Sequence, residues 1–146
     1  MSRTGCVRAA GVLVLGLVLC GCSDGPQAKL SPVNGRVTFK DQAVTAAEIY
    51  LNPDAKKGNQ GDLGSAVLQE DGTFSITTYH PKGPRPGVAP GSYKVTLGLG
   101  RRAEKELTKF RTVQTTPLTI EVPEEGLQNV VVDLDKGVVV TGGESK

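Results

Sequence analysis

The chain carries one histidine, His80, and a histidine is the side chain best suited to act as a general base near neutral pH. A base of this kind needs a nucleophile beside it and an acidic group that orients its ring. His80 stands between Tyr79 and Pro81 in a proline-rich stretch that supplies neither. The sequence therefore favours a solvated loop histidine, and we expect the chain not to be an enzyme.

Other residue types could hold a calcium ion or form a covalent cross-link. The carboxylates that could supply oxygen ligands are Asp54, Asp62, Glu70 and Asp71. They lack the close, alternating spacing of a calcium loop, so we interpret them as turn residues and expect no metal. A Lys–Asn isopeptide would use Lys40 with Asn129 or Asp133, assisted by Glu48. Strand alternation places Lys40 and Glu48 on the polar side, which argues against it.

The N-terminus carries a different chemical signal. Two arginines precede an apolar run at residues 12–19, which is too short for a membrane span and is typical of a secretory signal. The following Leu19-Cys20-Gly21-Cys22 resembles the lipobox of bacterial lipoproteins. That resemblance implies cleavage of residues 1–21 and attachment of acyl chains, palmitate among them, to Cys22. Cys20 fits less well, because the large Leu19 would precede it; an ordinary signal peptide is the alternative.

Cleavage would change the charge and thiol content of the chain. Cys6 and Cys20 would leave with the signal, so no disulfide, thiolate metal site or other cofactor site is expected. The full chain has 17 Lys+Arg and 15 Asp+Glu, and the signal contains two arginines and no acid. The processed chain is then neutral, which predicts no nucleic-acid partner. We expect a cell-envelope protein, lipid-anchored to a membrane through Cys22.

The remaining residues divide into a flexible tether at 22–32, a folded domain at 33–136 and a disordered tail at 137–146. Within the tail, an extension of the last strand over residues 138–141 is the alternative. Alternating apolar and polar residues predict strands, the central pair being a hairpin that turns at Asp71-Gly72. The predicted strands are residues 33–40, 44–51, 66–69, 73–78, 93–99, 118–122 and 129–134.

Three segments are predicted to be connections between strands. Residues 54–63 are polar, and residues 79–91 contain four prolines, which cannot donate to a strand ladder. Residues 101–113 are rich in charge, and we favour an extended crossover there over a helical turn. This segment could contact anionic lipid or a cell-wall polymer, although its glutamates dilute the basic charge.

The pattern predicts an all-β fold, namely a seven-stranded antiparallel Greek-key β-sandwich. The expected core is the apolar face of every strand. It comprises Val37, Phe39, Ile49, Leu51, Ala66, Leu68, Phe74, Ile76, Tyr93, Val95, Leu97, Leu118, Ile120, Val122, Val130, Val132 and Leu134.

Four motifs resemble the carboxypeptidase regulatory-like domain, a transthyretin-like or prealbumin-like sandwich close to the B-type repeats of collagen adhesins. They are Val33-Asn-Gly-Arg-Val37, Ala47-Glu-Ile-Tyr-Leu-Asn-Pro53, Glu70-Asp-Gly-Thr-Phe74 and Pro90-Gly-Ser-Tyr-Lys-Val95. The resemblance implies a fold more than an activity. Hydrolases related to transthyretin use several histidines, which this chain lacks.

The leading hypothesis is a non-catalytic binding or scaffolding module on the envelope surface. The candidate contact loops are residues 54–63 and 79–91. Within them the candidate contact residues are Asp54, Asp62, Tyr79, His80 and Arg85. The partner could be a cell-wall glycan or an envelope protein. The alternative is an assembly subunit that docks a protein along a sheet edge, and a hydrolase ranks third.

Overall fold

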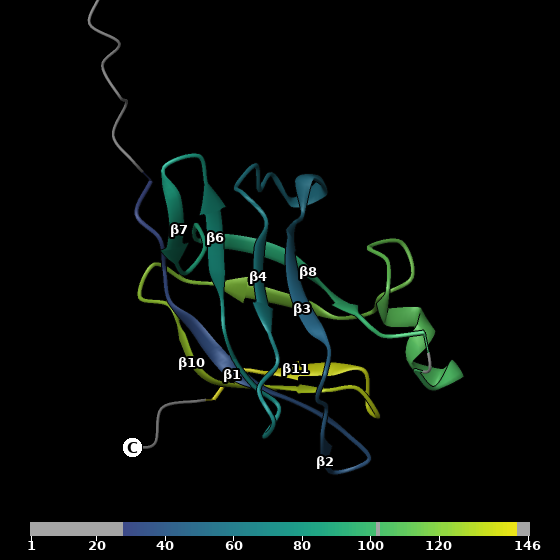
Figure 1. Cartoon of the computed structure of the whole chain (residues 1–146). Helices are drawn as coiled ribbons and strands as arrows, with labels where there is room; N and C mark the ends of the chain where they lie inside the picture. The colour runs from purple at the N-terminus through teal and green to yellow at the C-terminus, as the bar shows by residue number, and fades with distance from the viewer. Residues whose placement is uncertain (1–27, 102, 143–146) are drawn as a thin grey trace, which may run out of the picture.

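The computed structural model describes residues 28–101 and 103–142, and it shows an all-β chain in two layers (Figure 1). Cys22, the predicted signal at residues 1–21 and the last four residues lie outside the described part. Each layer is one β-sheet, and the apolar faces of the two sheets meet in a single core, which makes the fold a β-sandwich.

The first sheet has five strands in the order β11-β10-β1-β2, with β5 also paired to β1. Its strands are β1 (Val33–Phe39), β2 (Gln42–Ala43), β5 (Thr73–Ser75), β10 (Leu127–Asp133) and β11 (Val138–Val140). β1 is central, since it pairs with β10 on one side and with β2 and β5 on the other.

The second sheet has six strands in the order β7-β6-β4-β3-β8-β9, and every neighbouring pair is antiparallel. Its strands are β3 (Glu48–Pro53), β4 (Gly64–Val67), β6 (Thr77–His80), β7 (Gly83–Pro86), β8 (Gly91–Gly98) and β9 (Thr119–Val122). Two short 3-10 helices complete the chain, η1 (Ala55–Lys57) between β3 and β4, and η2 (Lys105–Phe110) between β8 and β9.

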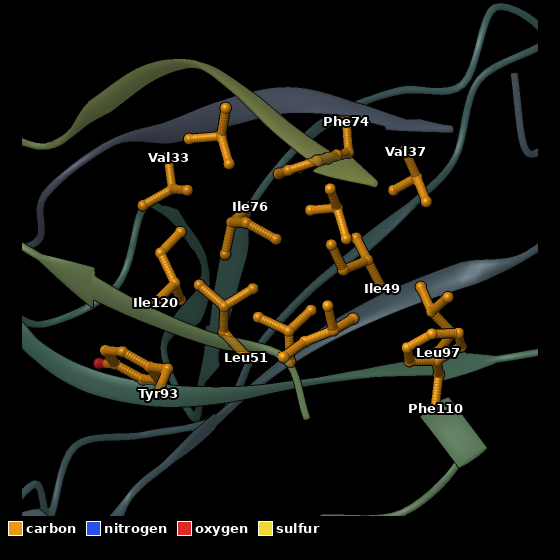
Figure 2. Packing of buried hydrophobic residues seen from close by; sticks show 14 of the residues in the cluster. Val33, Val37, Ile49, Leu51, Phe74, Ile76, Tyr93, Leu97, Phe110 and Ile120 are labelled. Carbon is orange, nitrogen blue, oxygen red and sulfur yellow. The ribbon is translucent and has the colours of Figure 1, made fainter. Parts of the chain in front are cut away.

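The core contains side chains from both sheets that point toward one another (Figure 2). The predicted inward residues are confirmed as buried, apart from Phe39 and Ala66, which are half-buried against the cluster. Sequence alternation missed five core residues, because they lie at strand ends, in connections or in a 3-10 helix. These are Val33, Ala47, Val88, Leu107 and Phe110.

The predicted central hairpin is wrong, although its turn is present. Gly72 has a φ of 75°, and the Asp71 carboxylate accepts hydrogen bonds from the backbone N–H and the hydroxyl of Thr73. The strands on either side then part, since β4 joins the second sheet while β5 pairs with β1 in the first. Strands on either side of a turn show the same alternation of apolar residues whether they pair with each other or enter different sheets. In both cases Phe74 and Ile76 are buried on one face.

The predicted loop at residues 79–91 is also wrong in its first half, where β6 and β7 form a hairpin. Pro84 and Pro86 lie on β7, and β7 is an edge strand of the second sheet. A proline is tolerated at an edge because its missing N–H can face solvent. The hairpin brings Arg85 opposite Thr78, which matters for the site below.

The described residues form eleven strands, whereas the sequence predicted seven. Among these strands one pair is parallel, whereas all pairs were expected to be antiparallel. Parallel pairing of β1 with β10 joins segments about a hundred residues apart in the chain, which local patterning does not reveal. Residues 101–113 contain the 3-10 helix η2. The alternative of a helical turn is therefore confirmed for this segment, and the favoured extended crossover is wrong. Leu107 and Phe110 anchor η2 in the core.

Both predicted boundaries of the domain shift outward. The tether was expected to reach residue 32, but Ser31 is fully buried and pairs with Val88 in a β-bridge, with N···O distances of 2.7 and 3.0 Å. The tail is not disordered from residue 137, because β11 pairs with β10 from Asp133 to Val131, and the alternative of strand structure at residues 138–141 is confirmed for residues 138–140. Pairing with the neighbouring strand β10 gives these valine-rich residues a regular structure.

Gly35 is required where β1 passes β10. The register between these strands shifts at a bulge, and Asn129 there has a φ of 55°. A Cβ on Gly35 would lie 2.1 Å from the Val130 carbonyl oxygen, a backbone atom that cannot move aside. We predict that Gly35→Ala lowers the free energy of unfolding by about 2 kcal/mol or more, measured by urea denaturation.

The matched control is Gly100→Ala, because a Cβ at Gly100 would meet nothing within 4 Å. This variant should stay within about 0.5 kcal/mol of the wild type. Equal stability of the two variants would show that the close approach of β1 and β10 does not determine the stability of the fold.

Candidate functional site

A small pocket opens beside β6 and β7, between the β3–β4 connection and the residues that precede β1. It has a volume of about 250 Å³, and we call it the histidine pocket. Its lining residues are Ala28, Leu30, Gln60, Gly61, Asp62, Thr78, His80, Arg85 and Ala89. The size suits a single polar group or one small ring rather than a large ligand.

The structure brings together three of the five predicted contact residues. Asp62 comes from the β3–β4 connection, His80 from β6 and Arg85 from β7. His80 and Thr78 lie two residues apart on one strand and so share a face, while Arg85 is the cross-strand partner of Thr78. The pocket thus combines an anionic, an aromatic and a cationic side chain.

The other two predicted contact residues lie elsewhere. Tyr79 is adjacent to His80 and therefore faces the opposite side of the sheet, where it is 72% exposed. Asp54 is buried at the start of η1, and its carboxylate accepts a hydrogen bond from the Lys56 backbone N–H at 3.1 Å. Asp54 is therefore a helix-capping residue.

The hydrogen bonds of His80 and Arg85 determine what each can offer a ligand. The Lys82 backbone N–H donates to Nδ1 of His80 at 3.3 Å, so the ring's proton belongs on Nε2. The Arg85 guanidinium donates to the Ala28 carbonyl at 3.4 Å through one nitrogen. Its remaining N–H groups, together with Nε2–H of His80, form a set of donors at the pocket.

Tyr93 lies beneath this pocket. It is 1% exposed, and its hydroxyl donates to the Ala89 carbonyl at 2.7 Å. Burial raises the pKa of Tyr93; a hydrogen bond with Asn59 lowers it, and the nearby Asp62 carboxylate raises it again. The phenol therefore stays protonated and lies as an uncharged group beneath the pocket.

Of the remaining lining residues, Gln60, Gly61 and Ala89 lie inside the two predicted contact loops, although the sequence did not single them out, and Ala28, Leu30 and Thr78 lie outside those loops. Thr78 was detectable in principle, since it alternates with His80, but only if residues 77–80 had been read as a strand. Gln60 and Ala89 are in connections without a periodic signal. Ala28 and Leu30 were assigned to the tether, and only the Ser31–Val88 bridge brings them to the pocket.

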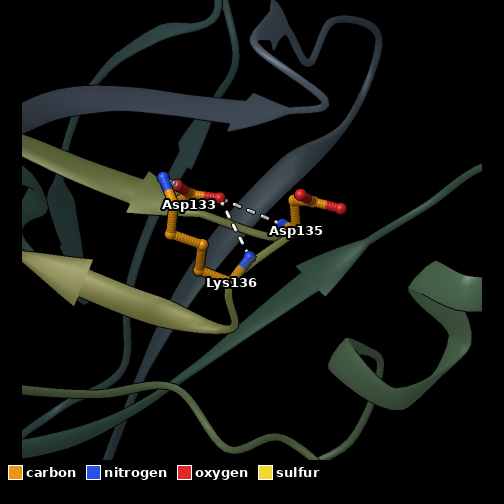
Figure 3. A network of polar contacts seen from close by, with 3 residues as sticks. All are labelled: Asp133, Asp135 and Lys136. Atoms are coloured by element: carbon orange, nitrogen blue, oxygen red, sulfur yellow. Dashed lines mark hydrogen bonds and ion pairs between the residues drawn. The ribbon is translucent and has the colours of Figure 1, made fainter.

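A second concave region, the outer groove, crosses the solvent face of the first sheet and has a volume of about 730 Å³. Its polar side chains largely satisfy one another. Asn34 donates to Gln128 and accepts from the Ser75 hydroxyl. The Lys136 ammonium donates to Asp133 at 2.6 Å, and this contact closes the β10–β11 turn (Figure 3). We therefore regard the outer groove as the weaker candidate.

Other proposed chemistry finds little support in the described residues. Lys40 is exposed and forms ion pairs with Glu104 at 3.1 Å and Glu106 at 3.3 Å, which leaves the isopeptide without its amine. Within residues 28–101 and 103–142, no group of three His, Cys, Asp or Glu side chains could hold a metal ion. In the same part of the chain, no helix has the length and apolar character needed to cross a membrane.

The Asp133–Lys136 contact predicts a pH-dependent stability. Hydrogen bonds from the side chain and then the backbone N–H of Lys136 hold the pKa of Asp133 below its usual 3.8. Because this pKa is lower in the folded state, the ionised carboxylate stabilises the fold above about pH 4 and the contribution is lost as the pH falls through the folded pKa. Asp133→Asn should lower Tm near pH 7, with the gap closing in acid.

The control for this prediction is Asp135→Asn, since the Asp135 carboxylate points away from Lys136 in Figure 3. Thermal melts across the acid range should show the same pH profile for this variant as for the wild type. A gap between wild type and Asp133→Asn that stays constant with pH would contradict the assignment.

No family model matches the chain, and no curated protein and no solved structure matches it either.

Proposed function

We propose that this chain is a non-catalytic, lipid-anchored protein of the cell envelope, attached through Cys22, whose sandwich is a binding or scaffolding module. The observation that carries the binding role is the convergence of Asp62, His80 and Arg85 in one pocket. That pocket opens where residues 28–31 join the domain, which is the side from which an anchor at Cys22 would lead.

The hydrogen bond at His80 supports binding rather than catalysis. In a hydrolytic triad the Nδ1–H of histidine donates to a carboxylate while Nε2 accepts a proton from the nucleophile. Here Nδ1 accepts from the Lys82 backbone N–H. Nε2 then carries the proton and acts as a donor, so in this tautomer that nitrogen suits the recognition of an acceptor group.

We further propose that the sandwich belongs to the carboxypeptidase regulatory-like type, with the transthyretin-like Greek key that this implies. Glycines from three of the motifs occupy positions where other residues would be strained. A Cβ on Gly35 would strike β10, while Gly72 and Gly91 have φ values of 75° and 143°. These positions support a structural reason for the motifs.

The donor set of the pocket favours a ligand that presents oxygen acceptors, such as the carboxylate and hydroxyl groups of a cell-wall glycan. Purified, processed protein should co-sediment with insoluble cell-wall polymer. Arg85→Ala should weaken that retention by about tenfold, because one hydrogen bond to a charged group is lost. Arg101→Ala, exposed and distant from the pocket, should leave it unchanged.

Two results would contradict the proposal. Equal retention of the Arg85→Ala and wild-type proteins would remove the pocket from the binding role. Turnover in a broad hydrolase screen that disappears in His80→Ala would replace binding with catalysis.

The second candidate is an assembly subunit that docks a protein partner along a sheet edge, and β11 is the observation that favours it. β11 lies at the edge of the first sheet, contains no proline, and exposes Val138 and Val140 by 42% and 52%. Edge strands of this kind accept an added strand from a partner.

Photo-crosslinking in intact cells tests this second candidate. A photoreactive residue at Val140 should yield one stoichiometric protein adduct if the edge docks a partner. The control position is Val67, which is 60% exposed but lies on β4 inside the second sheet, and it should yield none. Equal labelling from both positions would argue against edge docking.

A further inference from the structure

We propose that the histidine pocket recognises an α-amino acid group, that is, one carbon that bears both a free ammonium and a carboxylate. Such a group is present in a free amino acid and in a cell-wall polymer that carries an amino-acid unit with both groups unblocked. The inference rests on the proposed binding role of the pocket and adds to it the class of group that the pocket takes.

The three ionisable side chains of the pocket lie on one face of neighbouring strands. Gly64 on β4 pairs with Thr78 on β6, and Thr78 pairs with Arg85 on β7. Continuing the antiparallel register of β4 and β6 past Gly64 places Asp62 opposite His80. Opposite side chains have Cβ atoms about 5 Å apart, and diagonal neighbours are about 7 Å apart. The carboxylate, the imidazole and the guanidinium are therefore close enough to contact one small ligand together.

Asp62 disfavours a ligand that carries only negative charge. A carboxylate held by Arg85 and His80 would lie near the Asp62 carboxylate, and two like charges in one small site repel each other. The Asp62 charge also acts beneath the pocket, since burial raises the pKa of the Tyr93 phenol and Asp62 adds to that rise. A ligand carboxylate is accommodated when the same molecule places a cation beside Asp62.

The opposite charges of the pocket are not used up by pairing with each other. Among the described residues, no ion pair joins Asp62 to Arg85, although both line the pocket. The outer groove differs, because its Lys136 ammonium is already paired with the Asp133 carboxylate. An anion and a cation that stay apart in one cavity suit a ligand that carries the two complementary charges.

The surroundings of the pocket favour neither an anionic nor a cationic ligand. Lys29 and Lys82 are exposed at this end of the molecule, and so are Glu124 and Glu125 on the β9–β10 turn. This turn lies beside the segment that precedes β1, since the Ser31 hydroxyl donates to the Glu124 carbonyl at 2.8 Å. Long-range attraction therefore selects no sign of charge, and recognition depends on contacts inside the pocket. An α-amino acid group has no net charge, which agrees with this environment.

The size and the remaining lining of the pocket limit what the group can be attached to. The volume of about 250 Å³ is below the range of pockets that hold drug-sized molecules. Ala28, Leu30 and Ala89 add apolar side chains to the lining. A short aliphatic substituent on the α-carbon fits this space, so alanine is the probe of choice.

Calorimetric titration of the processed protein, purified in detergent, tests the proposal with alanine and two blocked forms of it. Both enantiomers of alanine carry the two charges, N-acetylalanine lacks the ammonium, and alaninamide lacks the carboxylate. At least one enantiomer should bind, and blocking either of its charges should weaken binding about tenfold or more, because a hydrogen bond between charged groups is lost. Binding of neither enantiomer, or equal binding of either blocked form, would overturn the proposal.

Asp62→Asn separates the ammonium contact from the rest of the pocket. The substitution removes the charge of an exposed side chain and keeps its shape. It should weaken alanine binding about tenfold and leave N-acetylalanine binding unchanged or tighter, because only alanine offers Asp62 a cation. Undiminished alanine binding, or an equal fall for both ligands, would contradict this role of Asp62.

The matched control is Asp135→Asn, since Asp135 is exposed in the β10–β11 turn and does not line the pocket. This variant should bind alanine as the wild type does. Equal loss of alanine binding in the two variants would show that the effect does not come from the pocket.

Co-sedimentation with cell-wall polymer separates this inference from the function on which it rests. Alanine binding without any retention on polymer would refute the polymer as the partner and keep the α-amino acid site. Retention that depends on Arg85, without alanine binding, would refute the α-amino acid site alone. Acetylating the amines of the polymer then identifies the source of the group, because retention falls if the polymer carries it and stays the same if a free amino acid is the ligand.

Discussion

The close pairing of β1 with β10 is the constraint on which the rest of the sandwich depends. β1 is the only strand of the first sheet that has partners on both sides along most of its length within the described residues. Its approach to β10 requires Gly35 and a bulge at Asn129. Once these strands are parallel and in register, Val37 and Val132 lie side by side and face the second sheet.

The segment that precedes β1 connects this constraint to the candidate site. The Pro32 carbonyl accepts from Leu127 at the start of β10, and the Val33 carbonyl accepts from Ile76. One residue earlier, Ser31 pairs with Val88 beyond β7. A short stretch of chain thereby joins both sheets, and it sets the position of the β6–β7 hairpin that carries His80 and Arg85.

The candidate site was predictable as a set of residue types but not as an assembly. Asp62, His80 and Arg85 came from two predicted loops, and their polar character among prolines and glycines singled them out. Tyr79 was selected on the same grounds and lies on the other face, because residues 77–80 form a strand and neighbouring side chains alternate. A loop prediction contains no alternation, so it could not separate Tyr79 from His80.

The class of the fold and most of its core could be predicted from the amino-acid sequence alone. Alternation of apolar residues identifies a buried face whatever the strand pairs with, since the period depends only on extended backbone. Turn residues such as Gly72 could be predicted from the sequence equally well. Three features became visible only in the folded chain: which strands pair, the separation of β4 and β5 into different sheets, and the edge hairpin formed by a proline-rich segment. The physical reason is that pairing depends on contacts between residues distant in the chain, and local periodicity contains no information about those contacts.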